Sequence, residues 1–383
     1  MRKLSLHLAI ATLTTSPILS FANIYDARAM ARGGVGLTMG EYNQSLKNPA
    51  LLATFDEKDD FSFAFNYGFF ASDKDGMLEA ADDVQTAIDD LERGTGSASD
   101  VNQQLKALDN KMALVDVGGS VLIAIPNQHI PLALMAKNTL SLGILFDYAP
   151  TDALQLSTCT KFSCNLNSLN SSISTSAVDI TEVGLMFAQS FDIGLDVGAT
   201  LKGQQIDLIT YNATISQFDS DDISDSNNIE KHNHINVDLG ALMRFGENKQ
   251  FSVAATIENA IAKTFDGTKV GGVVTEYELA PIVTTAVGYS STYFKIEANT
   301  DLTARKSFDK LLETQFSRVG VEFSAGRHLH LRAGYRTDMK DNVSDVISAG
   351  LGITPFDRLN IDVSAMKGDG DTYGVGLQLG FKI

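Results

Sequence analysis

The sequence of 383 residues contains no tryptophan, only two cysteines and only seven prolines. Two cysteines cannot build a disulfide framework or a four-thiolate metal site. Basic residues are also scarce, because 30 lysines and arginines face 47 acidic residues, for a formal net charge of −17. Nucleic-acid binding needs a basic surface that displaces counterions from phosphates, so this class of function is excluded.

The first 22 residues predict a secretory signal peptide. Arg2 and Lys3 precede an apolar run over Leu4–Leu19, and Ser20–Ala22 fits a cleavage site before Asn23. An N-terminal anchor helix is the alternative, but the run is short and interrupted by polar residues. Beyond this segment no apolar run reaches about 18 residues, which excludes a membrane-spanning helix. Export would place both cysteines in an oxidising compartment.

The rest of the chain is dominated by alternation of apolar and polar residues. From Phe61 to Phe69, and again from Tyr373 to Ile383, every second residue is apolar. Helices would space apolar residues by three and four, so these segments predict strands. The 31 glycines also favour strands and turns over a helical bundle.

The regular apolar face predicts an all-β, transmembrane antiparallel β-barrel. A tilted strand of about ten residues matches the hydrocarbon thickness, and lipid cannot satisfy an open sheet edge. About fourteen strands are expected, an even number as in bacterial outer-membrane barrels. Their predicted starts lie near Phe61, Val117, Thr139, Thr181, Asp192, Ile235, Gln250, Glu276, Thr292, Phe316, His328, Val346, Arg358 and Tyr373. A soluble sandwich or a two-domain soluble protein is the alternative.

The connections predict which end faces the periplasm. Tight turns, as at Gly246–Lys249, alternate with long connections, as over Pro150–Ile180. Short periplasmic turns and longer external loops are the usual asymmetry, and Asn127–Asn138 is then one oversized inner turn. Helical spacing returns over Met77–Lys111, with Gly94–Ser97 dividing two amphipathic helices. This helical insert, about residues 76–112, forms either a solvated excursion or a lid in the first external loop.

No residue pattern indicates an enzyme, a cofactor or a metal site. There is no nucleophile elbow and no P-loop, and His328 and His330 lack a third ligand. Cys159 and Cys164, with four residues between them in a polar external loop, predict a local disulfide. A hydrolase assembled from distant strands is the third choice among the functional classes. Many inward-facing glycines allow either close approach of a segment to the wall or simple curvature of the barrel.

The N-terminal stretch resembles a known family. Asp26–Gly36 followed by Asn48–Leu52 is similar to the hatch of the FadL-type outer-membrane transporters of long-chain fatty acids and other hydrophobic compounds, although Leu51 stands where that superfamily often has glycine. Nearly the whole mature chain resembles the TraF-like outer-membrane barrels, named for conjugative plasmid transfer. The hatch motif is carried by Arg28, Arg32, Gly33, Gly34, Gly36, Asn48, Pro49 and Ala50.

These observations predict residues 1–22 as the signal peptide, 23–60 as a hatch that plugs the lumen, and 61–383 as the barrel in the bacterial outer membrane. The resemblance implies passive uptake of a hydrophobic small molecule. The alternative is a structural outer-membrane component that contacts conjugation-apparatus or secretion proteins. Arg28 and Arg32 are four residues apart, so on a short helix both would reach carboxylates of the lumen wall. The alternative for them is exposure in a flexible arm.

Overall fold

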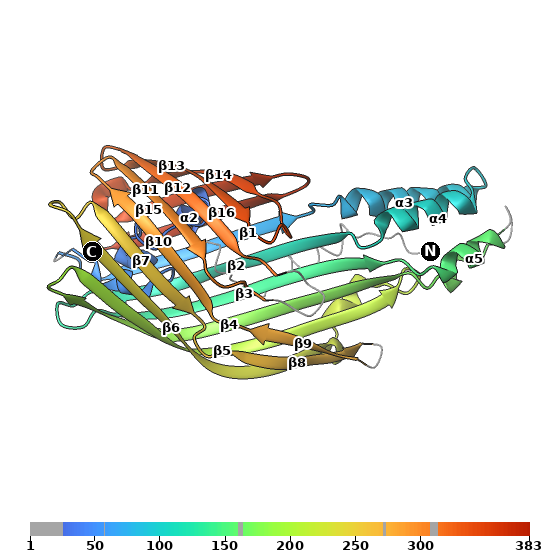
Figure 1. The fold of residues 1–383 in the computed structure, drawn as a ribbon, viewed down its shortest axis with the longest axis horizontal. Helices are drawn as coiled ribbons and strands as arrows, with labels where there is room; N and C mark the ends of the chain where they lie inside the picture. The colour runs from blue at the N-terminus through green and yellow to red at the C-terminus, as the bar shows by residue number, and fades with distance from the viewer. Residues whose placement is uncertain (1–25, 57, 160–163, 271–272, 307–312) are drawn as a thin grey trace.

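The computed structural model describes residues 26–56, 58–159, 164–270, 273–306 and 313–383, and it forms a closed antiparallel barrel of fourteen strands (Figure 1). The fold class and strand number predicted from the sequence are confirmed. The signal-peptide prediction for residues 1–22 lies outside the described residues. The barrel strands are β1 (Ser62–Ser72), β2 (Met112–Ile125), β3 (Leu132–Asp147), β4 (Ser172–Phe191), β5 (Leu195–Thr214), β6 (Ile229–Phe245), β7 (Phe251–Glu258), β10 (Ile282–Ser290), β11 (Phe294–Asp301), β12 (Phe316–Ala325), β13 (Leu329–Asp338), β14 (Val346–Ile353), β15 (Leu359–Gly368) and β16 (Tyr373–Lys382).

The alternation of residues along each strand separates an apolar outer face from a polar lumen. On β16, Val375 and Leu377 are exposed on the outside, whereas the intervening residues are buried. On β12, the inward Glu322 is buried while the outward Phe323 is exposed. β16 pairs with β1, so the sheet has no open edge in the bilayer. Within the described residues, no helix is both long enough and apolar enough to cross a lipid bilayer.

Strands β2 to β6 are much longer than the others. They have 14 to 20 residues, whereas the remaining barrel strands have 8 to 11. Figure 1 shows them running past the rest of the barrel toward the end that carries the helices. Outward-facing Asp179 and Asp207 mark where these strands leave the apolar zone. Backbone pairing continues beyond this level, so the predicted starts at Val117 and Thr181 were too late. The predicted start at Thr139 was too late at the opposite end, because β3 already pairs with β2 from Leu132.

Two further boundaries differ from the prediction. The expected oversized inner turn over Asn127–Asn138 is wrong, because β2 and β3 pair as far as Ile125 and Leu132. The barrel strand expected to begin near Glu276 begins later, as β10 at Ile282. Glu276 itself belongs to β9 (Val273–Leu279), which pairs with β8 (Lys263–Val270) in a separate two-stranded sheet. The segment has the apolar alternation of a strand, but pairing partners cannot be deduced from alternation alone.

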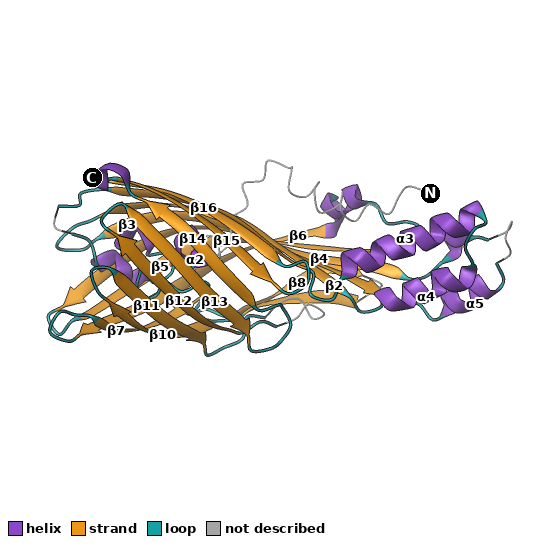
Figure 2. Ribbon diagram, turned by 90° about the horizontal axis from the view of Figure 1, so that it is seen from above, coloured by secondary structure: helices purple, strands orange, loops and turns teal. Residues whose placement is uncertain are grey.

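Three helices lie at the long-strand end of the barrel, α3 (Met77–Arg93), α4 (Ala98–Leu108) and α5 (Thr151–Ser157) (Figure 2). Gly94, at φ 74°, ends α3, and Ser97 caps α4 in a capping box with Asp100. The apolar faces of the helices share one core with Val115 and Ile144. Both of these belong to the outward-facing sets of β2 and β3. The helical insert therefore covers the outer face of the strand extensions, and these contacts do not support its interpretation as a lid.

The remaining helices are short. The hatch contains α2 (Ala27–Ala31), η1 (Tyr42–Gln44) and η2 (Pro49–Ala53), and both views place α2 among the strands near the C-terminus (Figures 1 and 2). External loops carry η3 (Leu166–Ser168), η4 (Ser220–Ser224) and η5 (Ser226–Asn228), and η6 (Pro355–Asp357) lies in the turn between β14 and β15.

Cys159 and Cys164 form a disulfide in the connection that follows α5. Both half-cystines pack against the core of the helical insert. Thiol labelling of the denatured, unreduced protein is expected to detect no free cysteine, and labelling after reduction is expected to detect two. Two reactive thiols in protein isolated without reductant would contradict the disulfide. The bond closes a short loop, so its removal should leave barrel assembly intact.

Candidate functional site: the hatch and the lumen

The described part of the hatch, residues 26–56 and 58–60, lies against a set of inward-facing glycines. A Cβ atom at Gly334 would stand 2.1 Å from the carbonyl carbon of Arg32, and one at Gly198 would stand 2.3 Å from that of Pro49. Gly320 on β12 is equally close to the Arg32 oxygen, at 2.3 Å. Of the two explanations for the inward glycines, close approach of a segment to the wall therefore applies at these positions.

The Asn-Pro-Ala part of the hatch motif forms a capped turn. The Asn48 Oδ1 accepts a hydrogen bond from the Ala50 N–H at 3.0 Å, and Pro49 occupies the first turn of η2. The Asn48 Nδ2 donates to the Leu37 carbonyl at 3.0 Å and to the Ala241 carbonyl on β6 at 3.4 Å. One buried amide thus links two parts of the hatch to the barrel wall.

The glycine run reverses the chain after α2. Gly33 and Gly34 have φ values of 73° and 99°, which residues with a Cβ rarely adopt. The Gly33 N–H donates to the Ser348 Oγ at 2.8 Å, and Ser348 donates to the Ala31 carbonyl at 3.0 Å. The turn is therefore fixed to β14 by hydrogen bonds in both directions.

Glu297 on β11 binds the next hatch segment. Its Oε1 accepts from the N–H groups of Gly36 and Leu37, each at 2.9 Å. Its Oε2 accepts from the Thr38 N–H at 2.9 Å, the Thr38 hydroxyl at 2.8 Å and the Met39 N–H at 3.0 Å. The side chain is completely buried, so the hatch backbone replaces the water that would solvate this carboxylate. No residue pattern in the sequence gave a sign of this role.

Arg28 and Arg32 both lie buried against wall carboxylates rather than in an exposed arm. The Arg28 Nε lies 2.8 Å from the Asp362 Oδ2, and the Arg32 Nη1 lies 3.3 Å from the Glu322 Oε2. Arg332 on β13 joins the two pairs, with its Nε 2.6 Å from Glu322 and its Nη1 2.7 Å from Asp362. The structure therefore brings the two hatch arginines into one network with acids of β12 and β15.

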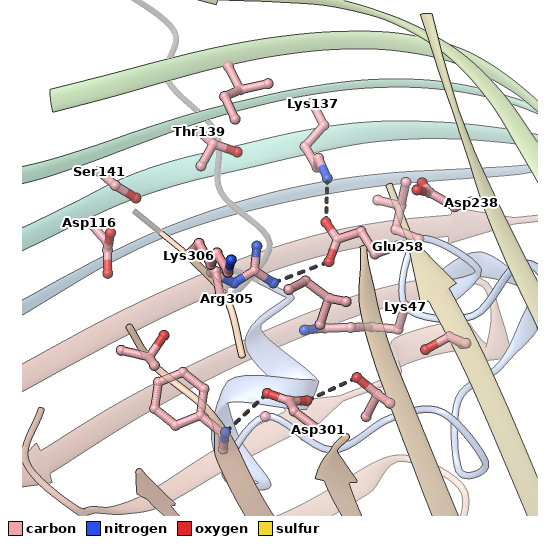
Figure 3. Close-up of a pocket in the computed structure, with 18 of the residues that line it drawn as sticks. Lys47, Asp116, Lys137, Thr139, Ser141, Asp238, Glu258, Asp301, Arg305 and Lys306 are labelled. Atoms are coloured by element: carbon pink, nitrogen blue, oxygen red, sulfur yellow. Dashed lines mark hydrogen bonds and ion pairs between the residues drawn. The ribbon is translucent and has the colours of Figure 1, made fainter. Parts of the chain in front are cut away.

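A cavity of about 260 Å³ lies on the external side of the hatch (Figure 3). We call it the lumenal cavity. Its charged groups are largely paired: Glu258 lies 3.6 Å from the Lys137 Nζ and 3.2 Å from the Arg305 guanidinium, and Arg318 lies 2.8 Å from Asp301. Between these pairs the lining is apolar, with contributions from the hatch, the wall and the external loops: Leu37, Leu46, Pro49, Phe70, Leu114, Leu142, Val178, Ile180, Tyr277, Ile282, Phe316 and Val343.

Lys47 is the hatch cation that lines this cavity. Burial, and secondarily the positive charge of Arg318, lower the pKa of Lys47 to about 8. Lys47 therefore carries its charge at neutral pH and loses it in mildly alkaline solution. The lumenal cavity thus combines apolar walls with a positive charge whose presence depends on pH.

The hairpin of β8 and β9 closes part of the external side. Its residues Phe265, Tyr277 and Leu279 are buried against inward-facing apolar residues of β4 and β5, including Val178 and Ile206. The sequence predicted a barrel strand beginning near Glu276 and left the helical insert as either a solvated excursion or a lid. The isolated apolar residues at 265, 277 and 279 were the available signal, but the surface they cover is visible only in three dimensions.

The histidine side chains do not come together at one site. The Nε2 of His232 lies 2.7 Å from the Asp266 carbonyl, and the Nδ1 of His330 lies 3.0 Å from the Ser324 hydroxyl. Among the described residues, no three histidine, cysteine, aspartate or glutamate side chains are grouped so that they could hold a metal ion.

The chain matches the model of one known protein family. The family model described as "F plasmid transfer operon, TraF, protein" matches residues 45–301. The chain belongs to this family. No curated protein matches it.

The chain is also similar to solved structures of outer-membrane channels. The toluene transporter TodX of Pseudomonas putida is 9% identical, with 95% of this chain and 99% of that chain covered and a TM-score of 0.56. A TodX deltaS2S3 mutant, described as a monoaromatic hydrocarbon channel, is 11% identical, with 94% of this chain and 98% of that chain covered and a TM-score of 0.58. The monoaromatic hydrocarbon channel CymD is 10% identical, with 95% of this chain and 98% of that chain covered and a TM-score of 0.53. The TraF-family chain thus has the FadL-type outer-membrane barrel fold.

Proposed function

We propose that this TraF-family barrel admits hydrophobic small molecules passively across the outer membrane. The observation that supports this most is the lumenal cavity, whose apolar lining comes from the hatch, the wall and the external loops together. A pocket with apolar walls and a few fixed polar groups is the usual form of a small-molecule site. The names of the solved neighbours, a toluene transporter and hydrocarbon channels, agree with this class of ligand.

In this proposal the hatch controls passage. The cavity is bounded by hatch residues such as Leu37, Leu46 and Pro49, so a ligand held there reaches the periplasm only after the hatch moves. The hatch is fixed to the wall at Glu297, at Ser348 and at the arginine network. These contacts are polar and buried, so they define discrete points whose loss would release the plug.

Filling the cavity tests the proposal. Thr139 lines the lumenal cavity (Figure 3). Leu134 on the same strand is exposed on the lipid-facing side. Thr139→Trp is expected to reduce uptake of the apolar fluorescent probe 1-N-phenylnaphthylamine by intact cells to the level of cells without the protein. Leu134→Trp should leave uptake unchanged, because a tryptophan there contacts lipid.

The same two variants report binding directly. The natural chain has no tryptophan, so each variant carries a single indole. Quenching of that indole by the probe is expected for Thr139→Trp in purified, folded protein and not for Leu134→Trp. Uptake by wild-type cells no greater than that by cells without the protein would contradict the proposal.

The second candidate is a structural outer-membrane component of conjugation or secretion. It rests on the family description, which concerns an operon for plasmid transfer. The helical insert would then be the surface that meets a partner, because it projects from the external end of the barrel (Figure 2). Absence of probe uptake together with reduced conjugation in cells that lack α3 and α4 would favour this candidate.

A further inference from the structure

Four inward-facing amide side chains lie where the hatch meets β15, β16 and β1. Gln378 on β16 stands opposite Asn66 on β1. Asn360 on β15 stands opposite Gly380, where a Cβ atom would lie 3.8 Å from the Asn43 Nδ2 of η1. We call Asn43, Asn66, Asn360 and Gln378 the polar seam. Each of the four is at most 4% exposed.

The polar seam leaves several hydrogen-bonding groups without a partner. Among the described residues, neither polar atom of the Asn43 side chain nor of the Gln378 side chain is paired. The Asn66 Oδ1 and the Asn360 Nδ2 are also unpaired. These atoms have essentially no accessible surface, so no water molecule fits beside them. A buried amide without partners is costly until water reaches it, so the closed position of the hatch is destabilised at the seam.

The hatch helix at the seam, η1, directs its paired polar groups into the hatch rather than to the wall. The Gln44 Nε2 donates to the Asp26 Oδ2 at 2.7 Å, and Asp26 also belongs to the hatch. The preceding hatch segment is instead bound to the wall at Glu297. Arg32 has two unpaired donors as well, but its Nη1 holds it at Glu322. The seam is therefore the part of the hatch contact with the weakest polar attachment to the wall.

The polar seam also lies between two cavities. At one end Asn360 and Gln44 line a second cavity, of about 170 Å³, at the short-turn end of the barrel. At the other end the Asn66 Nδ2 donates to Ser120 on β2 at 3.0 Å. The residue opposite Ser120 on β3 is Lys137, which lines the lumenal cavity. Separation of the hatch from the wall along the seam would join the two cavities.

We propose that the hatch opens at the polar seam, by separation of η1 from β16 and β1 and entry of water between them. The unpaired amides of Asn43 and Gln378 gain water partners in the open state, which lowers the free energy of opening. The inference rests on the proposed function, since it names the place where the hatch lets the ligand leave the lumenal cavity. The short-turn end of a bacterial barrel faces the periplasm, so this opening leads there.

Hydrogen exchange of the purified, folded barrel in detergent measures how often η1 separates, by mass spectrometry of a peptide covering residues 41–45. Gln378→Met replaces the unpaired amide by an apolar side chain of similar length. The closed state then loses an unpaired polar group, and the open state exposes an apolar one. Exchange of this peptide should therefore slow by about tenfold. Asn43→Leu removes the unpaired amide on the hatch side and should also slow exchange, after correction for the intrinsic rate.

Gln204→Met is the matched control. Gln204 on β5 is buried and faces inward like Gln378, but its Nε2 donates to Glu182 at 2.6 Å and to Asn259 at 3.0 Å. Its replacement should leave the exchange of residues 41–45 unchanged. Unchanged or faster exchange in both Gln378→Met and Asn43→Leu would overturn opening at the seam.

Probe uptake separates this inference from the proposed function. Uptake of 1-N-phenylnaphthylamine by cells that carry Gln378→Met should fall in step with the slower exchange. Slower exchange with uptake equal to that of the wild type would support opening at the seam and contradict the proposed passage of the ligand past the hatch.

Discussion

Replacing Glu297 by alanine is expected to release the hatch and make the closed lumen leak ions. The carboxylate accepts five hydrogen bonds from Gly36, Leu37, Thr38 and Met39. Its removal leaves four buried backbone N–H groups without an acceptor, each costing about 1–3 kcal/mol. Even partial recovery by water leaves a loss of several kcal/mol, which is comparable to the stability of a whole domain. The loss of stability affects the hatch and not the barrel, because the wall strands keep their own backbone pairing.

Planar-bilayer conductance and limited proteolysis measure this effect. Glu297→Ala should raise the conductance and expose residues 36–39 to protease, whereas the folded barrel should keep its resistance to unfolding by detergent. Glu297→Gln retains one oxygen acceptor and should give an intermediate conductance. Glu247→Ala changes an exposed acid of the turn after β6 and serves as the charge-matched control. A conductance equal to that of the wild type in Glu297→Ala would show that this carboxylate does not hold the hatch.

The contrast between Glu297 and the glycine run shows what the sequence could and could not reveal. Gly33 and Gly34 were identifiable because a backbone with positive φ favours glycine, so this backbone conformation can be recognised from the residue type. The partners of Glu297 are backbone N–H groups, which every residue except proline carries. No residue pattern distinguishes the four that meet this carboxylate, so the contact was invisible before the fold was known.

The barrel itself was predictable for a similar reason. Lipid selects apolar side chains at every second position, and the resulting alternation gave the fold and the number of strands. This selection stops where the bilayer stops. Beyond Asp179 and Asp207 the strands continue by backbone pairing and pack against the helical insert instead of lipid, and the starts near Val117 and Thr181 were therefore predicted too late. The strand start near Glu276 was misplaced because β9 shares the alternation but buries its apolar side against other strands rather than in lipid.

Val321→Asp is expected to impair assembly of the barrel far more than Ser324→Asp on the same strand. Val321 lies in the middle of β12 and faces outward, between the exposed Val319 and Phe323. An aspartate there places a charge in the hydrocarbon, at a cost on the order of 2 kcal/mol for a site near mid-depth. Ser324 faces the lumen, where its hydroxyl lies 3.0 Å from the His330 Nδ1, so an aspartate there stays among polar groups and away from lipid.

The folded fraction after refolding into lipid vesicles, read from the mobility of unheated protein on gels, compares the two variants. The Val321→Asp protein should show a reduced folded fraction and unfold at lower denaturant concentration, and the Ser324→Asp protein should resemble the wild type. Equal assembly of both would contradict the assignment of the two faces of β12. Loss of assembly in Ser324→Asp alone would reverse that assignment, because the charge would then be tolerated on the face that we place in lipid.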